Sequence, residues 1–500
     1  MKTRPLFQCA GLALCLTFIP ARAAEDTFTS VQSRITEFKL ANGLHFIVLE
    51  RHQAPVVSFY TYADVGSVQE TKGITGLAHM FEHMAFKGSQ TIGTKNYAEE
   101  KNALDRVDQA FLALQRERGK TGGGDKATLD KLRKDLDAAQ EGAGKFVVPN
   151  EFGQIIEGAG GKGLNASTGS DKTDYYFSLP SNALEIWFYL ESERWLNPVL
   201  REFYKEAGVV REERRMRTEN NPIGRLIEEF LATAYKAHPY GEPGVGHMSD
   251  LESFTRMDAE AFFQKYYSPS NLTIAIVGDV DPKQVRQLAE AYFGRIKPRP
   301  KPEPLRTVEP PQNVERSVTF RARAQKMFLI GYHKPAMTHP DNAVYDTISS
   351  LLSSGRSSRL HESLVTKKKV AVQAGGFSGF PGEKYPGLFL FYAFPAPGKS
   401  NQDAEKEMMV EIERLKTEPV SAEELEGVKN RARAALITMM SSNTTMGSAL
   451  TQYQVLTGDW RNLFTIIDKI NAVTAADVQR VAKATFTASN RTTGMLETEQ

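Results

Sequence analysis

The pattern of hydrophobic and polar residues predicts short strands separated by longer helices in both halves of the chain. Asn42-Gly43 is a turn signal directly before the first apolar run. Helical stretches follow, including residues 184–195 and 206–217. The chain therefore reads as α+β in each half. The predicted strands are residues 44–49, 56–63 and 273–277 in the first half and 327–332 in the second.

Residues 101–142 have a separate helical periodicity. Two runs of apolar residues share spacings of three, four and three: Leu104, Val107, Phe111 and Leu114, then Leu129, Leu132, Leu136 and Ala139. Gly122-Gly123-Gly124 lies between the runs. This pattern predicts an inserted helical hairpin with one apolar stripe on each arm. The alternative is a disordered, charged insertion.

A proline-rich segment and an internal repeat predict two related domains. Residues 297–311 alternate proline with charged residues, which favours an extended, solvated linker. Residues 255–273 and 474–492 share Thr, Asp, aromatic, Ser, Asn and Thr positions at a constant offset of 219 residues. We therefore expect domains at 24–296 and 312–500 that arose by duplication.

The N-terminus resembles a secretory signal peptide. Basic residues precede a mostly apolar run, and small residues at Ala21-Arg22-Ala23 follow it. The apolar run is shorter than the roughly 20 residues of a membrane span, which makes an uncleaved anchor the weaker reading. We expect cleavage after residue 23 and export, most simply to the periplasm of a Gram-negative cell. No other stretch approaches the length of a membrane span.

Composition narrows the function classes. The chain has 62 Lys+Arg against 60 Asp+Glu, and this near balance argues against a dedicated nucleic-acid binder. Both cysteines, Cys9 and Cys15, lie in the leader, so the mature chain would have neither a disulfide nor a cysteine-rich zinc module. Any zinc site must be built from histidine and carboxylates.

The sequence His79-Met80-Phe81-Glu82-His83 is the strongest chemical signal. On a helix, His79 and His83 project from one face, and neutral imidazoles are good zinc ligands. Glu82 could reach a water molecule at the metal without being a ligand. The alternatives are a helix with two ordinary histidines and a zinc site of purely structural role.

A catalytic zinc ion needs a third protein ligand and one open position. Glu206 and Glu213 are seven residues apart and share one helix face, whereas Glu212 points elsewhere. Spacing alone leaves open a solvated, charged helix with no metal role.

The inverted His-x-x-Glu-His order, within Gly76-Leu77-Ala78 and Met84-Ala85-Phe86-Lys87-Gly88, resembles the pitrilysin/insulinase family of zinc peptidases, the inverzincins. This family includes the mitochondrial processing peptidase β subunit and two-domain bacterial members. The resemblance implies two homologous α/β-sandwich domains that form half of a clamshell. It also implies one zinc ion per chain, with His79, His83 and Glu213 as ligands, Glu82 as general base and Glu206 as a supporting catalytic residue.

The resemblance also suggests how substrate binds. Asn165 and Ala166 lie in a segment that resembles the strand edge on which the family pairs extended peptides. Arg359 resembles a substrate-binding arginine, but valine stands where its tyrosine partner is expected, near residues 369–372. A homodimer or heterodimer with a related subunit could supply the missing clamp. The implied activity is zinc-dependent hydrolysis of peptides or unfolded polypeptides; the alternative is a non-catalytic binding or assembly subunit.

Overall fold

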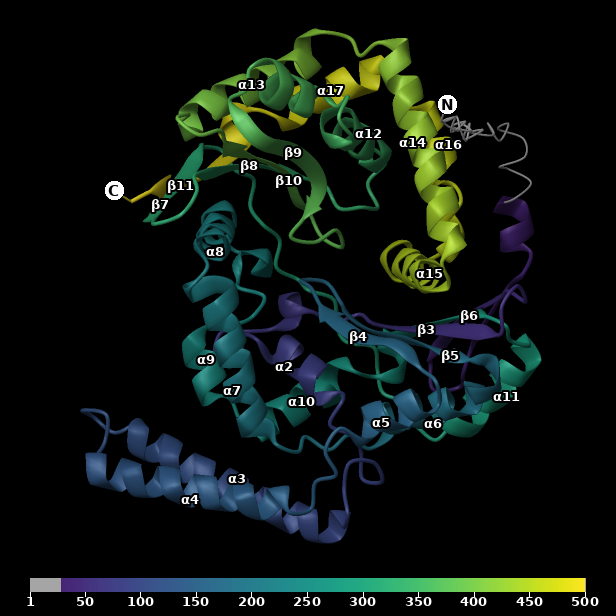
Figure 1. The fold of residues 1–500 in the computed structure, drawn as a ribbon, viewed down its shortest axis with the longest axis vertical. Coiled ribbons are helices and arrows are strands. Elements are labelled where there is room, and N and C mark those ends of the chain that lie inside the picture. Colours follow the sequence, from purple (N-terminus) through teal and green to yellow (C-terminus); the bar gives the residue numbers. More distant parts are fainter. Residues whose placement is uncertain (1–27, 500) are drawn as a thin grey trace, which may run out of the picture.

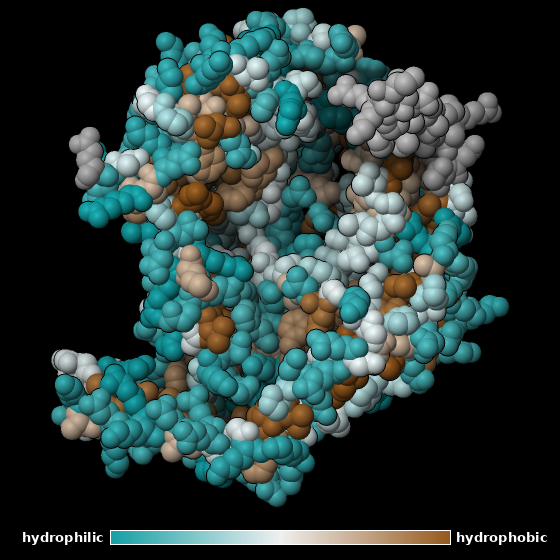
Figure 2. All heavy atoms as spheres, in the orientation of Figure 1, coloured by the Kyte–Doolittle hydropathy of each residue, from teal (hydrophilic) through white to brown (hydrophobic). Residues whose placement is uncertain are grey.

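The computed structural model describes residues 28–499, and the leader predicted at residues 1–23 lies outside them. Two β-sheets, one in each half of the chain, form the framework (Figure 1). The surface in Figure 2 is mainly hydrophilic, and it is hollowed between the lobe around the first sheet and the lobe around the second. The predicted α+β class is confirmed.

The first sheet has six strands in the order β1-β2-β6-β3-β5-β4. Strands β2 and β6 are parallel, and all other neighbours are antiparallel. Strand β4 forms one edge, since it pairs only with β5. The strands are β1 (Ile35–Lys39), β2 (His45–Glu50), β3 (Val56–Ala63), β4 (Lys162–Thr168), β5 (Thr173–Pro180) and β6 (Leu272–Gly278).

The second sheet has five strands in the order β7-β11-β8-β10-β9. Its pairings match those of β2-β6-β3-β5-β4, with one parallel pair followed by three antiparallel pairs. The two sheets therefore repeat one topology, with β1 added to the first. The strands are β7 (Arg316–Ala322), β8 (Met327–Lys334), β9 (Ala371–Phe380), β10 (Gly387–Pro395) and β11 (Arg491–Thr498).

The repeat seen in the sequence also appears in side-chain detail. Helices α10 (Arg256–Tyr266) and α17 (Ala475–Thr485) each begin with a Thr–Asp capping box. Asn271 then donates hydrogen bonds to the carbonyl oxygens of Asp64 and Tyr266, and Asn490 makes the equivalent pair to His333 and Thr485. The shared positions are structural: they attach the end of one helix to the C-terminal end of a central strand, β3 or β8.

Helices cover both faces of each sheet (Figure 1). In the first half these are α2 (Leu77–Met84), α3 (Tyr97–Arg118), α4 (Lys126–Gly144), α5 (Glu151–Gly158), α6 (Leu184–Leu196), α7 (Phe203–Arg214), α8 (Pro222–Ala234), α9 (Met248–Ser253), α10 and α11 (Pro282–Phe293). In the second half they are α12 (Asn342–Ser353), α13 (Asn401–Thr417), α14 (Ala422–Ser441), α15 (Asn443–Thr457), α16 (Ile466–Ala472) and α17.

The two halves exchange one helix each. Helix α8, from the first half, packs on the second sheet, where Phe230 lies over Gly331 and Gly494. Added Cβ atoms at these glycines would lie 2.7 and 3.0 Å from the Phe230 ring, so the close approach requires glycine. Helix α15, from the second half, packs on the first sheet, with Gly447 against Tyr60. Each half therefore completes the hydrophobic core of the other.

The segment with the separate periodicity forms helices α3 and α4, which pack together and project from the lower lobe (Figure 1). Leu104, Val107, Phe111 and Leu114 are buried along α3. Residues 297–313 contain neither helix nor strand. Within residues 28–499, no helix is both long and apolar enough to cross a membrane.

Candidate metal centre

Helix α2 carries the two histidines, and its first turn is held by Glu70. Gly76 precedes the helix with φ 91°, and a Cβ there would lie 2.5 Å from the carbonyl oxygen of Val245. The Glu70 carboxyl accepts hydrogen bonds from the backbone N–H groups of Gly76 and Ala78, both at 2.7 Å. These N–H groups have no partner within the helix, so Glu70 fixes the start of α2. Burial raises the pKa of Glu70 to about 8.

His79 and His83 meet Glu213 from helix α7. Nε2 of His79 lies 3.5 Å from Oε2 of Glu213, and Nε2 of His83 lies 3.4 Å from the same oxygen. The three ligand atoms all lie within 4.8 Å of one another. Tetrahedral zinc with bonds of about 2.1 Å separates its ligand atoms by roughly 3.4 Å, so this donor set fits the ion. It is the one group of this kind in the described part of the chain.

Glu206 lies on the same face of α7 as Glu213, two turns earlier, and it binds the Nδ1 side of the His83 ring. Its Oε1 lies 3.0 Å from Nδ1 of His83, and its Oε2 lies 2.7 Å from Nζ of Lys87. Burial raises the pKa of Glu206, but the hydrogen bonds from His83 and Lys87 outweigh burial and lower that pKa to about 2. Glu212 instead points to solvent with a 63% exposed side chain.

Glu82 lines a cavity of about 640 Å³. The cavity lies between helix α2 and strand β4 at the edge of the first sheet. Burial raises the pKa of Glu82 above its ordinary value. His83 lines the same cavity, together with Leu164, Asn165 and Ala166 of strand β4. The structure thus brings Glu82, the ligand group and the strand edge together.

Of the predicted substrate-binding residues, Asn165 and Ala166 lie at the edge of β4, and Arg359 does not. Asn165 is exposed, and its side-chain oxygen accepts a hydrogen bond from the N–H of Ala166 at 2.9 Å. Arg359 is buried in the second half and makes a two-pronged ion pair with Glu424, at 2.7 and 2.9 Å. Glu424 caps helix α14, so the structure gives Arg359 a role in holding that helix.

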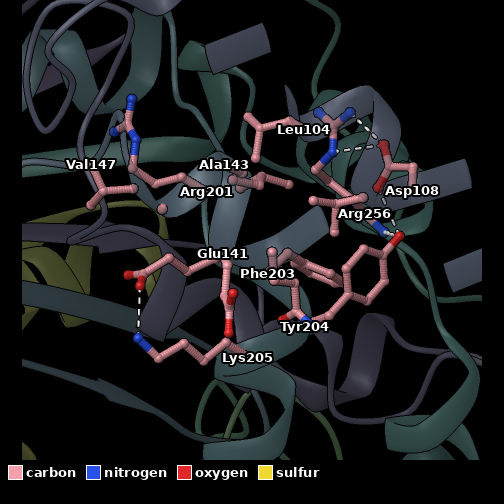
Figure 3. Close-up of a pocket in the computed structure, with 15 residues that line it drawn as sticks. Leu104, Asp108, Glu141, Ala143, Val147, Arg201, Phe203, Tyr204, Lys205 and Arg256 are labelled. Atoms are coloured by element: carbon pink, nitrogen blue, oxygen red, sulfur yellow. Dashed lines mark hydrogen bonds and ion pairs between the residues drawn. The ribbon is translucent and has the colours of Figure 1, made fainter. Parts of the chain in front are cut away.

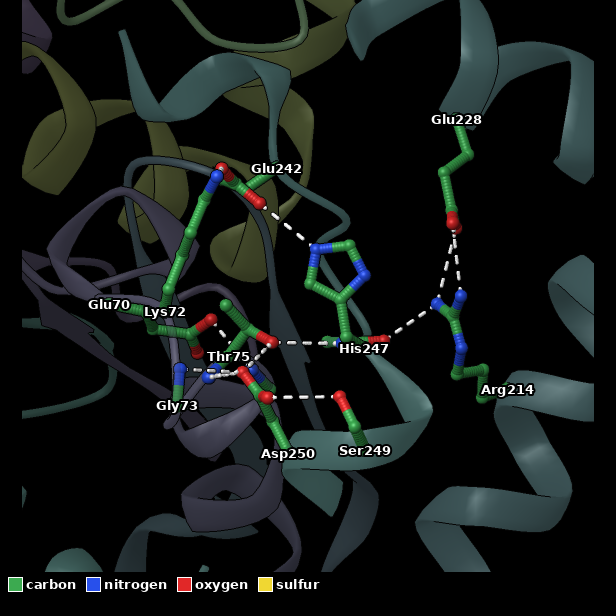
Figure 4. Close-up of polar contacts among 12 residues, drawn as sticks. Glu70, Lys72, Gly73, Thr75, Arg214, Glu228, Glu242, His247, Ser249 and Asp250 are labelled. Atoms are coloured by element: carbon green, nitrogen blue, oxygen red, sulfur yellow. Dashed lines mark hydrogen bonds and ion pairs between the residues drawn. The ribbon is translucent and has the colours of Figure 1, made fainter. Parts of the chain in front are cut away.

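The sequence did not predict that residues 246–250 bridge α2 and α7 through hydrogen bonds (Figure 4). Thr75 Oγ1 donates to Asp250 at 2.7 Å and accepts a hydrogen bond from the N–H of His247 at 2.8 Å. On the other side, Arg214 donates to the carbonyl oxygen of Gly246 at 2.6 Å. Arg214 follows Glu213 directly, so residues 246–250 link the two helices that carry the candidate ligands. No sequence pattern indicates these contacts.

Two related α/β sandwiches with an inverted His-x-x-Glu-His helix are the arrangement of the inverzincin class of peptidases. Comparison with known proteins agrees with this class. Residues 46–116 match the family described as insulinase (peptidase family M16), and residues 253–432 match the peptidase M16 inactive domain.

Relatives match over nearly the whole chain. It is 30% identical over 466 residues to the zinc protease PqqE of Helicobacter pylori, covering 92% of this chain and 91% of that protein. An uncharacterized zinc protease of Rickettsia felis is 25% identical over 403 residues, covering 80% and 82%. The crystal structure of a protease from Helicobacter pylori matches with a TM-score of 0.77 and 28% identity, over 93% of this chain and 99% of that one. The chain belongs to the insulinase family, peptidase family M16.

The match to an inactive domain falls mainly on the second half, and the repeat explains it. Helix α14 begins 219 residues after α7, and at this offset Leu425 and Ala432 stand where the first half has Glu206 and Glu213. The second half therefore lacks the two carboxylates that approach the histidines in the first half.

Proposed function

We propose that the chain is a zinc-dependent endopeptidase that hydrolyses peptides or unfolded polypeptides. The observation that carries this proposal is the convergence of His79, His83 and Glu213. His83 and the adjacent Glu82 line a cavity that is bordered by a strand edge. The names of the relatives, which are zinc proteases, support the choice of metal.

His79, His83 and Glu213 would hold one zinc ion per chain. Three protein ligands leave one position open, as catalytic zinc sites require. When bound, zinc polarises the peptide carbonyl and lowers the pKa of water. Glu206 keeps the ring of His83 oriented, because its carboxylate binds Nδ1 and leaves the lone pair of Nε2 facing Glu213.

Glu82 is the proposed general base. Its carboxylate takes a proton from the attacking water and then gives that proton to the leaving amine. The exposed edge of β4 at Asn165 and Ala166 would add the substrate as a further strand, so that main-chain hydrogen bonds give affinity with little demand on sequence.

We propose that residues 24–296 form the catalytic domain, with the hairpin as an insertion, and that residues 312–500 form a non-catalytic domain joined by the linker at 297–311. Because the fold is half of a clamshell, a second, related subunit would close the chamber and supply the substrate clamp. A homodimer and a heterodimer both satisfy this requirement. On the basis of its leader, we propose that the protein acts in the periplasm.

The test compares the mature chain with three site variants and one control variant, using internally quenched peptides and metal analysis. We expect Glu82→Gln to retain zinc and lose cleavage, whereas His79→Ala and Glu213→Ala lose zinc as well. Glu212→Gln, on the same helix but pointing to solvent, is the matched control and should cleave normally. Cleavage by Glu82→Gln at the wild-type rate would refute the mechanism. A zinc-loaded wild-type chain that cleaves no peptide, alone or with a related subunit, would instead support a binding or assembly role.

A further inference from the structure

A second cavity, of about 300 Å³, lies where the root of the α3–α4 hairpin meets the first turn of α7 (Figure 3). Its walls come from helices α3, α4 and α7, from the first residue of α10, and from the segments that follow α4 and precede α7. Most of the wall is apolar. The apolar side chains are Leu104, Val107, Ala143, Val147, Leu200 and Phe203.

Five of the polar residues in this wall pair with one another: Asp108, Glu202, Tyr204, Lys205 and Arg256. The hydroxyl of Tyr204 donates to Asp108 at 2.8 Å, and Nε of Arg256 donates to the other oxygen of that carboxylate at 3.0 Å. At the opposite end, Lys205 donates to Glu202 at 2.8 Å (Figure 3). Because these groups satisfy each other, an occupant gains most by contributing apolar surface.

The second cavity adjoins the catalytic one. Val147, Arg201, Glu202 and Lys205 line both. The catalytic cavity holds Glu82 and the edge of β4, so a peptide that lies along this edge and passes Glu82 reaches the hairpin cavity with its next residues. The shared wall points to the peptide in the catalytic cavity as the source of the occupant.

We propose that the hairpin builds a specificity subsite for a large apolar side chain of the peptide substrate, at a position away from the scissile bond. This inference rests on the proposed peptidase function and adds a substrate preference to it. A volume of about 300 Å³ is at the lower end for small-molecule pockets, and it is ample for one leucine, methionine or phenylalanine side chain. The insertion thereby acquires a role in choosing substrates.

Two glycines of α4 allow a matched test. Gly144 lines the hairpin cavity, and a Cβ added there meets no atom within 4 Å, so Gly144→Phe adds a large side chain at the cavity wall without a backbone clash. Gly142, on the same helix, also has open space around an added Cβ but lines neither cavity. Gly142→Phe is therefore the control for any general effect of placing phenylalanine on α4.

The first experiment digests a random decapeptide library with the zinc-loaded chain and sequences the products. We expect a preference of about tenfold or more for large apolar residues at one position beyond the two residues that flank the cut. Gly144→Phe should abolish this preference and keep cleavage of peptides that lack it, while Gly142→Phe keeps both. Absence of the preference in the wild-type chain, or its persistence in Gly144→Phe, would overturn the proposal.

The second experiment does not depend on cleavage. A decapeptide carrying p-benzoylphenylalanine is cross-linked to the zinc-loaded Glu82→Gln chain, and the attachment sites are mapped by mass spectrometry. We expect attachment at Leu104, Val107 or Phe203, and its loss in the double variant with Gly144→Phe. Attachment only at other sites contradicts the subsite. If the wild-type chain cleaves nothing yet these cross-links form, the subsite stands and the peptidase proposal fails.

Discussion

Glu206 binds His83 on the side of the ring away from the metal ligands: its Oε1 lies 3.0 Å from Nδ1, while Nε2 of the same ring lies 3.4 Å from Glu213. A carboxylate in this place fixes both the tautomer and the orientation of a ligand histidine. Lys87 holds the second oxygen of Glu206 at 2.7 Å, so the carboxylate cannot turn away.

Glu206→Gln should therefore weaken zinc binding without removing a ligand. The neutral amide loses the charge that orients His83 and pairs with Lys87, and we expect an affinity about 10- to 100-fold lower. Competition with a chromophoric chelator measures this change. Glu212→Gln should leave the affinity unchanged, and an unchanged affinity in Glu206→Gln as well would exclude the orienting role.

Thr75→Val should loosen the connection between the two ligand-bearing helices. The substitution keeps the shape of a side chain that is 1% exposed but removes its hydroxyl, leaving the N–H of His247 without its acceptor. We expect a loss of about 1–3 kcal/mol in the free energy of unfolding, together with weaker zinc binding. Thr75→Ser retains the hydroxyl and is the control. Urea unfolding in the presence of a chelator separates the stability effect from the metal effect, and equal stability of the valine and serine variants would contradict this role.

Glu70 should make the stability of the metal-free protein depend on pH. Its pKa is raised by burial from 4.5 to about 8, so between these values the folded state holds a proton that the unfolded state has released. Stability from this group is therefore greatest at low pH and falls as pH rises from about 5 to about 8, by at most about 1.4 kcal/mol per pH unit. Glu70→Gln mimics the protonated carboxyl and should flatten this slope in urea unfolding curves. A variant with the wild-type slope would show that Glu70 does not titrate in this range.

Arg359→Ala tests whether this residue serves the substrate or the fold. Since Arg359 is bound to Glu424, which is about one-third exposed, we expect a loss of about 1–2 kcal/mol in unfolding free energy and little change in KM. A double-mutant cycle with Glu424→Gln should show coupling between the two positions. An increased KM with unchanged stability would restore the substrate-clamp interpretation.

The features that follow a local pattern could be predicted from the sequence. These features depend on short-range periodicity or on identical residues. They are the strands at 56–63 and 327–332, helix α2 with its His-x-x-Glu-His sequence, and the repeat at a 219-residue offset. The approach of Glu213 to the histidines required the family resemblance, because charged residues at helical spacing are common on solvated faces.

Contacts between distant segments could not be predicted in this way. The helix predicted at 206–217 begins earlier and changes to a π-helix at Arg215–Glu219, where an added Cβ on Gly224 would lie 1.9 Å from the carbonyl oxygen of Arg217. The change from α-helix to π-helix accompanies the close approach of α8. Likewise, the pairing of Arg359 with Glu424 depends on how α14 packs, which no local pattern records.

The exchange of α8 and α15 makes the two repeats inseparable as folding units. Removing either half would strip a helix from the other and leave apolar strand residues, such as Ile47 and Leu49 or Leu329 and Leu496, facing water. A rotation of one repeat against the other would likewise pull these helices from their sheets. If a second subunit closes the chamber as we propose, a substrate would then be admitted by separation of whole subunits. A single repeat alone would need a second copy of itself to be stable.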